Sequence, residues 1–400
     1  MSSNALARAS LDECVKCTIC ESQCPVMAVT PLFPGPKFVG PQAERFRHHE
    51  TVDHGVDYCS SCGTCTLVCP QGVKIAELNS VARAVMKSSH MPLRDQIISR
   101  TTLMGMAMTP VAPVANAVLG FPPARWAMEQ VIGIHRHAAM PTAQGHTFDH
   151  WWKRHTSPAA PTRGQVVFFH GCAGQYFEVE TSIKTVEVLE HLGFEVLVPK
   201  QGCCGLALQS NGLFDTATAY VTKLARALDV APGVPVIASA ASCVGMLKHE
   251  AREIMSVHDA TLDEVGARAY DVSEFLLPLA EAGELPAFQS VNETVAYHAP
   301  CQLKGQGMGK PALALLRLIP GLTVVDAEAT CCGIAGTYGF KKEKYDIAMA
   351  VGKPLFDKVR EVNPRLAVCD TETCRWQIAA ATGAKVVHPV WLIHRALGLS

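Results

Sequence analysis

The sequence has little charge and no excess of either sign. Of its 400 residues 18% are charged, and 35 Lys and Arg residues stand against 36 Asp and Glu residues, for a formal net charge of −1. Nucleic-acid-binding proteins usually carry a basic excess, so this balance excludes a nucleic acid as the expected partner. Because 48% of the residues are hydrophobic, a disordered or fibrous chain is excluded too. The length suggests two or three domains, at roughly 150 residues each.

Several familiar motifs are also missing. Residues 1–13 lack the apolar core of a secretory signal, which predicts a cytoplasmic protein. No G-x-G-x-x-G run opens a helix, so no dinucleotide site is expected. The run Gly305-x-Gly307-x-Gly309-Lys310 lacks the first glycine and the final Ser or Thr of a phosphate loop, and is interpreted as a turn. No Ser/His/Asp or paired-carboxylate spacing indicates a hydrolytic site.

Cysteine, in contrast, is abundant. There are 17 cysteines: eight within the first 69 residues, none in residues 70–171, and nine from Cys172 to Cys374. In a reducing cytosol, closely spaced cysteines more often bind metal or carry out redox chemistry than form structural disulfides. The sequence therefore predicts a metal or redox protein whose two cysteine-rich parts are separated by residues 70–171.

The first eight cysteines form two runs of the same spacing, C-x-x-C-x-x-C-x-x-x-C-P, which end at Pro25 and Pro70. This is the spacing of bacterial ferredoxins, in which the fourth cysteine binds the other cluster. Structural zinc, the alternative, usually takes paired C-x-x-C knuckles, often with histidine. The runs therefore favour two [4Fe–4S] clusters. The crossed rule assigns the ligands as Cys14, Cys17, Cys20 and Cys69 for the first cluster, and Cys59, Cys62, Cys65 and Cys24 for the second.

The remaining cysteines reveal an internal repeat. Cys172 precedes the pair Cys203–Cys204 by 31 residues, and Cys301 precedes the pair Cys331–Cys332 by 30. A glycine follows each pair (Gly205 and Gly333), and single cysteines trail at Cys243 and Cys374. A vicinal disulfide, buried free cysteines and structural zinc are alternatives, but matched offsets favour metal or cluster binding in two homologous halves.

Each half alternates strand-like apolar runs with helical segments. The expected strands are Val166–His170, Glu195–Pro199, Pro235–Ser239, Thr294–His298, Thr323–Ala327 and Leu366–Cys369, and two expected helices are Glu178–His191 and Phe214–Leu228. This order predicts a parallel α/β sheet in each half. The cysteines follow the carboxyl ends of the strands, where open α/β sheets bind their ligands. His170 and His298 lie at related places; we interpret them as hydrogen-bonded strand-end histidines rather than as groups that tune a cluster.

Residues 101–124 carry no formal charge, and four prolines interrupt them, at positions 110, 113, 122 and 123. A membrane-spanning helix needs about 20 mainly apolar residues with internally satisfied backbone bonds. Because interior prolines remove such bonds, we expect an interfacial or subunit-docking segment, or a pair of core helices, rather than a clean span. Arg125, Arg136 and His137, which follow, would suit an anionic membrane surface.

These motifs resemble a known family. Two ferredoxin runs followed by two CCG halves are similar to the iron–sulfur C subunits of anaerobic glycerol-3-phosphate dehydrogenases, over nearly the whole chain. Four stretches favour this branch: Phe33–Lys37, Gly40-Pro41 with Glu44-Arg45, Thr102–Gly105, and Cys331–Glu343. Related groups are the iron–sulfur subunits of glycolate oxidase, lactate-utilisation proteins, and fused B and C subunits of heterodisulfide reductase.

The resemblance implies an α/β protein with an α-helical, ferredoxin-like dicluster domain over residues 1–95. A linker (96–160), which could touch a membrane or a partner, and two cysteine-rich CCG domains (161–290 and 291–400) would follow. In that family two flavoprotein subunits oxidise glycerol 3-phosphate, and the iron–sulfur subunit passes electrons to the menaquinone or ubiquinone pool. The implied location is peripheral, on the cytoplasmic side of the inner membrane, and the chain is not expected to be catalytic alone.

The family's C-x-x-C motif departs here from its pattern, with Thr371 and Ala240 where its first cysteine would stand; Cys369 has no assigned role. Four matching cysteines remain for each CCG site, enough for one or two further clusters or for zinc. They are Cys172, Cys203, Cys204 and Cys243 in the first site, and Cys301, Cys331, Cys332 and Cys374 in the second. Glycolate or lactate oxidation, a heterodisulfide-reductase-type enzyme acting on thiols, and a zinc-stabilised docking scaffold are the alternative functions.

Overall fold

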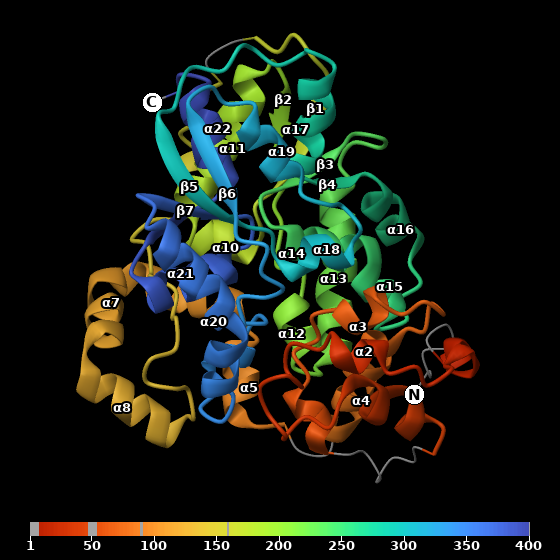
Figure 1. Ribbon diagram of the computed structural model, residues 1–400. Helices are drawn as coiled ribbons and strands as arrows, with labels where there is room; N and C mark the ends of the chain where they lie inside the picture. Colours follow the sequence, from red (N-terminus) through yellow and green to blue (C-terminus); the bar gives the residue numbers. More distant parts are fainter. Residues whose placement is uncertain (1–7, 47–53, 89–90, 158–159, 400) are drawn as a thin grey trace.

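The computed structural model describes residues 8–46, 54–88, 91–157 and 160–399 (Figure 1). Up to residue 100 the described elements are all helices, and all but α4 are short: η1 (Ser10–Glu13), α2 (Ile19–Ser22), η2 (Phe38–Gln42), η3 (His54–Tyr58), α3 (Thr64–Leu67), α4 (Ile75–Ser88) and α5 (Leu93–Ile98). Left-handed residues start two of them, Thr18 before α2 and Gly63 before α3. These turns curl the chain around the cysteine side chains.

The uncharged segment is helical. It forms α6 (Thr101–Met108), η4 (Thr109–Val111) and α7 (Ala112–Gly120), and α8 (Pro122–Val131) and α9 (Phe148–Trp152) follow. Pro110 lies in the 3₁₀ turn η4, and Pro122 opens α8, where a missing N–H costs no helical hydrogen bond. The interior prolines therefore tighten the helix between α6 and α7 without ending it.

The first CCG half is a four-stranded parallel sheet with the order β2-β1-β3-β4. Its strands are β1 (Gln165–Phe169), β2 (Glu195–Leu197), β3 (Val236–Ala238) and β4 (Ala269–Asp271). Its helices are α10 (Gly171–Tyr176), α11 (Val179–His191), α12 (Leu206–Ser210), α13 (Phe214–Leu228), α14 (Ala241–Gly245), η5 (Met246–Glu250), α15 (Ala251–Glu253), α16 (Ala260–Ala267) and α17 (Val272–Glu281). Residues 166–169 of β1 are all buried, as expected for a parallel strand covered on both faces.

The second half repeats this topology with the order β6-β5-β7-β8. Its strands are β5 (Glu293–His298), β6 (Leu322–Asp326), β7 (Leu366–Cys369) and β8 (Lys385–Val387). Its helices are α18 (Cys301–Gly305), α19 (Pro311–Arg317), η6 (Tyr338–Phe340), α20 (Tyr345–Val362), α21 (Glu372–Thr382) and α22 (Pro389–Ala396). The predicted α/β class, with helices first and then two repeated sheets, is confirmed.

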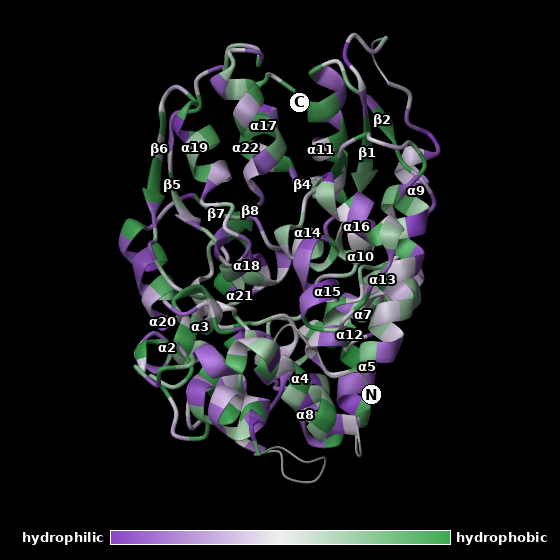
Figure 2. Ribbon diagram, turned by 90° about the vertical axis from the view of Figure 1, so that its right-hand side faces the viewer, coloured by the Kyte–Doolittle hydropathy of each residue, from purple (hydrophilic) through white to green (hydrophobic). Residues whose placement is uncertain are grey.

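The two sheets share a layer of helices. Figure 2 shows β5 and β6 on one side and β1 and β2 on the other, with α11, α17, α19 and α22 between them. In this layer α22 of the second half contacts α11 and α17 of the first, and α19 contacts α17. Val390 and Ile393 of α22 belong to the same buried cluster as Val166 and Ile183 of the first half. The two halves therefore have a common core.

A buried ionic network ties the helical region to both halves. The carboxylate of Asp95 on α5 accepts hydrogen bonds from Lys87 of α4 at 2.5 Å and from Lys341 of the second half at 2.9 Å. Lys341 also donates to Asn211 of the first half at 2.8 Å. Nearby, Lys344 pairs with Asp57 at 2.7 Å. Through Asp95 and Lys341, all three parts of the chain meet at one buried cluster.

Candidate metal centres

The structure brings the first predicted cluster ligands together. The thiol of Cys20, at the start of α2, lies within electrostatic range of three others, those of Cys14, Cys17 and Cys69. This is the crossed set, because Cys69 comes from the second run. Of the four, Cys17 is exposed and Cys20 is buried, so this group reaches the surface of the molecule.

The second predicted set also converges. The thiol of Cys65 on α3 lies near those of Cys59, Cys62 and Cys24. Backbone N–H groups point at two of the sulfurs: Met27 N–H donates to Cys24 Sγ at 3.5 Å, and Ser61 N–H donates to Cys59 Sγ at 3.4 Å. Such N–H···S bonds stabilise a thiolate, which is the form that binds metal.

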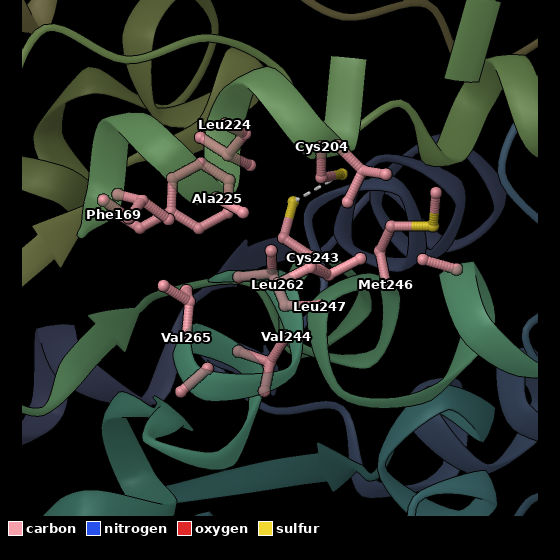
Figure 3. Close-up of a cluster of buried hydrophobic side chains, with 14 of the residues drawn as sticks. Phe169, Cys204, Leu224, Ala225, Cys243, Val244, Met246, Leu247, Leu262 and Val265 are labelled. Carbon is pink, nitrogen blue, oxygen red and sulfur yellow. Dashed lines mark hydrogen bonds between the residues drawn. The ribbon is translucent and has the colours of Figure 1, made fainter. Parts of the chain in front are cut away.

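The first CCG site gathers four cysteines from three segments: helix α10, the loop before α12 and helix α14. Cys204 and Cys243 have their sulfurs 3.4 Å apart, and those of Cys203 and Cys172 lie 3.6 Å apart; all four are free thiols. Figure 3 shows Cys204 and Cys243 facing each other at the edge of a dense apolar cluster. Thr101, the first residue of α6, donates from its hydroxyl to Cys172 Sγ at 3.1 Å. The uncharged segment thus starts in contact with this site.

The second CCG site is built in the same way and holds one more sulfur. Cys332 and Cys374 have their sulfurs 3.1 Å apart, and the Cys301 thiol is hydrogen-bonded to that of Cys331. Cys369, which sequence reasoning left unassigned, is fully buried at the end of β7, and its thiol contacts that of Cys374. Its position next to this site follows from the register of β5 and β7.

The glycine after each cysteine pair has a left-handed backbone conformation. Gly205 has a φ of +84° and Gly333 a φ of +85°, a region that favours glycine. In this conformation Gly205 N–H donates to Cys203 Sγ at 3.4 Å, and Gly333 N–H donates to Cys331 Sγ at 3.3 Å. Each glycine therefore turns the chain back so that its own amide stabilises the first sulfur of the pair.

The eight cysteines assigned to the two CCG sites from the sequence line one cavity of about 650 Å³, and Cys62 and Cys69 of the N-terminal runs line it too. Cys62 lies close enough to Cys331 and Cys301 for their charges to interact. Apolar walls are contributed by Met104, Met140, Phe177 and Trp376, among others. The cysteine groups thus form a continuous array from the helical region to both halves.

The donor set fits metal centres. Burial raises the pKa of the Cys20 thiol to about 11 and that of Cys24 to about 12. Packed thiols of this kind ionise only when a cation supplies the compensating charge, and a bound metal deprotonates a coordinating thiol outright. The grouping into fours and the N–H donors are what iron–sulfur ligation requires.

The two strand-end histidines differ. His170 donates from Nδ1 to the Gly171 carbonyl at 2.8 Å, as a strand-end histidine should. His298 is 2% exposed, and neither of its ring nitrogens has a hydrogen-bond partner among the described residues. Burial lowers the pKa of His298 to about 4, so the ring is neutral. Our interpretation of both as hydrogen-bonded histidines is therefore wrong for His298.

Thr371 and Ala240, which replace the cysteines of the family pattern, occupy equivalent places. Each is the N-cap of the helix that carries the trailing cysteine, α21 and α14, and both are buried.

Sequence reasoning missed a further ionisable group, Glu250 in η5, which lines the cavity and whose pKa burial raises to about 7. No signal marks it in the sequence, because it stands among other charged residues in a helix.

The helix from Thr101 to Gly120 is long and apolar enough to cross a membrane, and only 11% of its apolar window is buried. Valines at 111, 114 and 118, together with Leu103, Met106 and Phe121, are more than half exposed. Of the three cations that follow, His137 is exposed, Arg136 is partly exposed and Arg125 is turned inward. Arg125 is buried and donates to the carbonyl oxygens of residues 135, 136 and 138, and Arg136 pairs with Glu129. They hold the chain around α8 in place.

Two family models match the chain. A 4Fe-4S dicluster domain matches residues 10–73, and a cysteine-rich domain, CCG, matches twice, over residues 166–248 and 295–379. These matches confirm that the protein carries several iron–sulfur clusters; their number and their ligand sets stay predictions.

Among curated proteins, the C subunit of the anaerobic glycerol-3-phosphate dehydrogenase of Escherichia coli K12 is 36% identical over 97% of this chain and 99% of its own. The glycolate oxidase iron–sulfur subunit of the same organism is 25% identical, over 97% of this chain and 94% of its own. The D subunit of the dihydromethanophenazine:CoB–CoM heterodisulfide reductase of Methanosarcina barkeri is 23% identical, over 98% and 95%.

Proposed function

This chain belongs to the family of anaerobic glycerol-3-phosphate dehydrogenase C subunits, and from that premise we propose that it relays electrons from flavoprotein subunits to membrane quinone. The observation that carries the proposal is the continuous array of cysteine groups along one cavity. An iron–sulfur centre at such cysteines accepts and gives one electron at a time. The ligand sets that we propose are the four groups of four predicted from the sequence.

One end of the array suits a flavoprotein partner. The first cysteine group reaches the surface at Cys17, and exposed apolar side chains flank it, with Val15 63% exposed and Ile19 41% exposed. Exposed apolar side chains of this kind typically mark a protein interface. We propose that electrons enter here from the flavin-carrying subunits.

The other end suits a membrane. The first CCG site touches Thr101, from which the exposed apolar helix of residues 101–120 begins. One side of this helix is fixed to the rest of the protein, because Asn116 makes two 2.8 Å hydrogen bonds with the backbone of Ala143. An anchored helix with exposed valines would lie in the membrane interface. We propose a peripheral location in which the first CCG site is the one nearest the quinone.

The test of the relay is reconstitution with the flavoprotein subunits. With glycerol 3-phosphate as substrate, Cys204→Ser should nearly abolish reduction of a quinone analogue, while reduction of a dye at the flavin survives. This chain alone should reduce no dye. Quinone reduction that survives in Cys204→Ser, or dye reduction by this chain alone, would contradict the relay. Glycolate or lactate as the only working substrate would assign the chain to a related branch.

The test of the membrane segment uses Val114→Asp together with Val118→Asp. Burying two valines stabilises an interfacial position by roughly 3 kcal/mol, which is about a hundredfold in partitioning. The double variant should therefore move from the membrane pellet to the supernatant, with its iron content unchanged. Val230→Asp is the control, because Val230 is 53% exposed but lies far along the chain from this segment. Unchanged pelleting of the double variant would make the segment a partner-docking element.

A further inference from the structure

His170 and His298 occupy matched positions in the repeat. They are 128 residues apart, the same separation as between Cys203 and Cys331. His298 is the last residue of β5, and His170 directly follows β1, the equivalent strand. Both are buried at the cavity end of their sheets, His170 at 6% and His298 at 2% exposure. A difference between them is therefore a difference between two otherwise parallel sites.

His170 has partners for its ring in the first half and in the linker before it. Its Nδ1–H donates to the carbonyl of Gly171 at 2.8 Å, and its Nε2 lies 3.7 Å from a carboxylate oxygen of Asp149. The ring also packs against Phe148, with 5.1 Å between the ring centroids. Nδ1 of this ring thus has a hydrogen-bond acceptor and Nε2 has only the nearby carboxylate of Asp149, with which it makes no hydrogen bond.

His298 faces the sulfurs of the second CCG site. One of its ring nitrogens and the sulfurs of Cys332 and Cys374 all lie within 4.8 Å of one another, and all three residues are buried. In the register of the sheet it stands beside Cys369 of β7. Within the described residues both nitrogens lack a hydrogen bond, and an unsatisfied buried polar group costs about 1–3 kcal/mol. A metal ion bound by one ring nitrogen and the sulfurs would satisfy that nitrogen, and a bound ion is one recognised explanation of an unpaired buried group.

We propose that His298 is a ligand of the metal centre at the second CCG site, beside the thiolates of Cys332 and Cys374, and that it takes the place of one of the other two thiolates in the set proposed above. This inference rests on the proposed assignment of that site to a metal centre. An imidazole ligand carries no negative charge, and replacing thiolates with imidazole raises the reduction potential of iron–sulfur centres. The two halves would therefore carry unlike centres, all-thiolate in the first half and mixed in the second.

The test is spectroscopic and uses the full chain, purified without oxygen and labelled with ¹⁵N only in histidine. Metal analysis first decides the method: pulsed electron paramagnetic resonance for an iron–sulfur centre, zinc K-edge absorption for zinc. We expect a strong nitrogen coupling that changes on ¹⁵N labelling, or a zinc shell that contains nitrogen beside sulfur. A centre with no histidine coupling, or with a sulfur-only shell, would overturn the proposal without the need for any variant.

Variants identify the histidine. His298→Ala should abolish the coupling or the nitrogen shell, and His298→Cys should restore the metal with a sulfur-only signature and, for iron, a lower midpoint potential. His170→Ala is the matched control and should leave the signature unchanged. A signature lost in His170→Ala but kept in His298→Ala would refute the assignment.

The variant Cys332→Ser distinguishes an error in the proposed metal site from an error in the proposed histidine ligand. If Cys332→Ser leaves metal content and spectrum unchanged, the proposed metal site itself is wrong. If Cys332→Ser removes the centre while His298→Ala changes nothing, the metal site stands and only the histidine ligand is refuted.

Discussion

Asp271 and Asp370 are two buried carboxyl groups that meet between the two halves. Asp271 ends β4 of the first half, Asp370 follows β7 of the second, and both are 0% exposed. Burial, reinforced by the nearby Asp370 charge, raises the pKa of Asp271 to about 8. Burial also raises the pKa of Asp370, but only to about 6, because Tyr297 donates a hydrogen bond to its carboxylate at 2.8 Å. At neutral pH the pair therefore retains one proton, mainly on Asp271.

This proton makes stability depend on pH. An unfolded aspartate loses its proton near pH 4 and the folded Asp271 near pH 8, so the folded state binds more protons between these values. The free energy of unfolding should therefore fall as the pH rises from about 4 to about 8. Asp271→Asn should flatten this dependence, because the amide is neutral and still caps α17, as Asp271 does through its bond from Ser273 N–H at 2.9 Å.

Thermal unfolding measured across this pH range tests the prediction. Asp259→Asn is the matched control, since Asp259 is also an N-cap, that of α16, but is not enclosed between the halves. An equal pH slope in wild type and Asp271→Asn would show that the pair does not hold the proton.

Individual residues were predictable from the sequence only where their spacing repeats. The sixteen assigned cysteines are brought into four groups as their offsets predicted, with the ligand roles still to be tested. His298 and Glu250 were misjudged or missed, because their roles depend on the absence of a hydrogen bond and on burial, and neither leaves a pattern in the chain. Cys369 gains its position only through the pairing of β7 with β5.

At the scale of elements, the backbone is sterically constrained in the turn after each cysteine pair. Gly333 and Gly205 share the same positive φ, which costs another residue about 1–2 kcal/mol. A Cβ on Gly333 would also lie 1.9 Å from the Ala348 carbonyl oxygen of α20, whereas a Cβ on Gly205 would lie 3.0 Å from that of Ala217. The helix behind the turn is therefore closer in the second half.

We accordingly expect Gly333→Ala to destabilise the protein clearly more than Gly205→Ala, and to lower the metal content of the second CCG site. Unfolding midpoints of the two variants, measured side by side with metal analysis, check this. Similar midpoints would mean that α20 moves aside at little cost.

The elements themselves were largely predictable. All six strands expected from apolar runs are present within a residue or two, and Phe214–Leu228 has the predicted bounds. The strands β4 and β8 were missed because each offers only two consecutive apolar residues, whereas the equally short β2 and β3 lie in runs of at least three. The helix of residues 101–120 was expected to be broken by its prolines, but Pro110 is absorbed in a single tight turn.

At the scale of the whole molecule, Asp95 is the shared anion of the three parts. Burial acts to raise its pKa, but Lys341 and Lys87 outweigh burial and hold it below the ordinary value. Asp95→Ala would leave two buried ammonium groups without this partner, and removal of one member of a buried pair costs about 3–5 kcal/mol. We expect a loss of that size in the free energy of unfolding, with the transition less cooperative because the parts separate.

Chemical denaturation followed by both circular dichroism and cluster absorbance measures this. Asp357→Ala is the control, since Asp357 pairs with Lys353 on the surface of α20 and its removal should change stability little. Coincident, unshifted transitions in Asp95→Ala would show that the three parts are joined by their apolar contacts alone.

The shared helix layer has a consequence for how the protein is made. The apolar faces of α11 and α17 in the first half are covered by α22, which begins at Pro389, more than a hundred residues after α17 ends. During translation the first half leaves the ribosome with these faces exposed and stays so until α22 has been synthesised. Exposed apolar surface of this kind attracts chaperones and promotes aggregation. The shared core, and the cavity in which the cysteines converge, can therefore close only after α22 has been made. We expect the CCG centres to be inserted after that step.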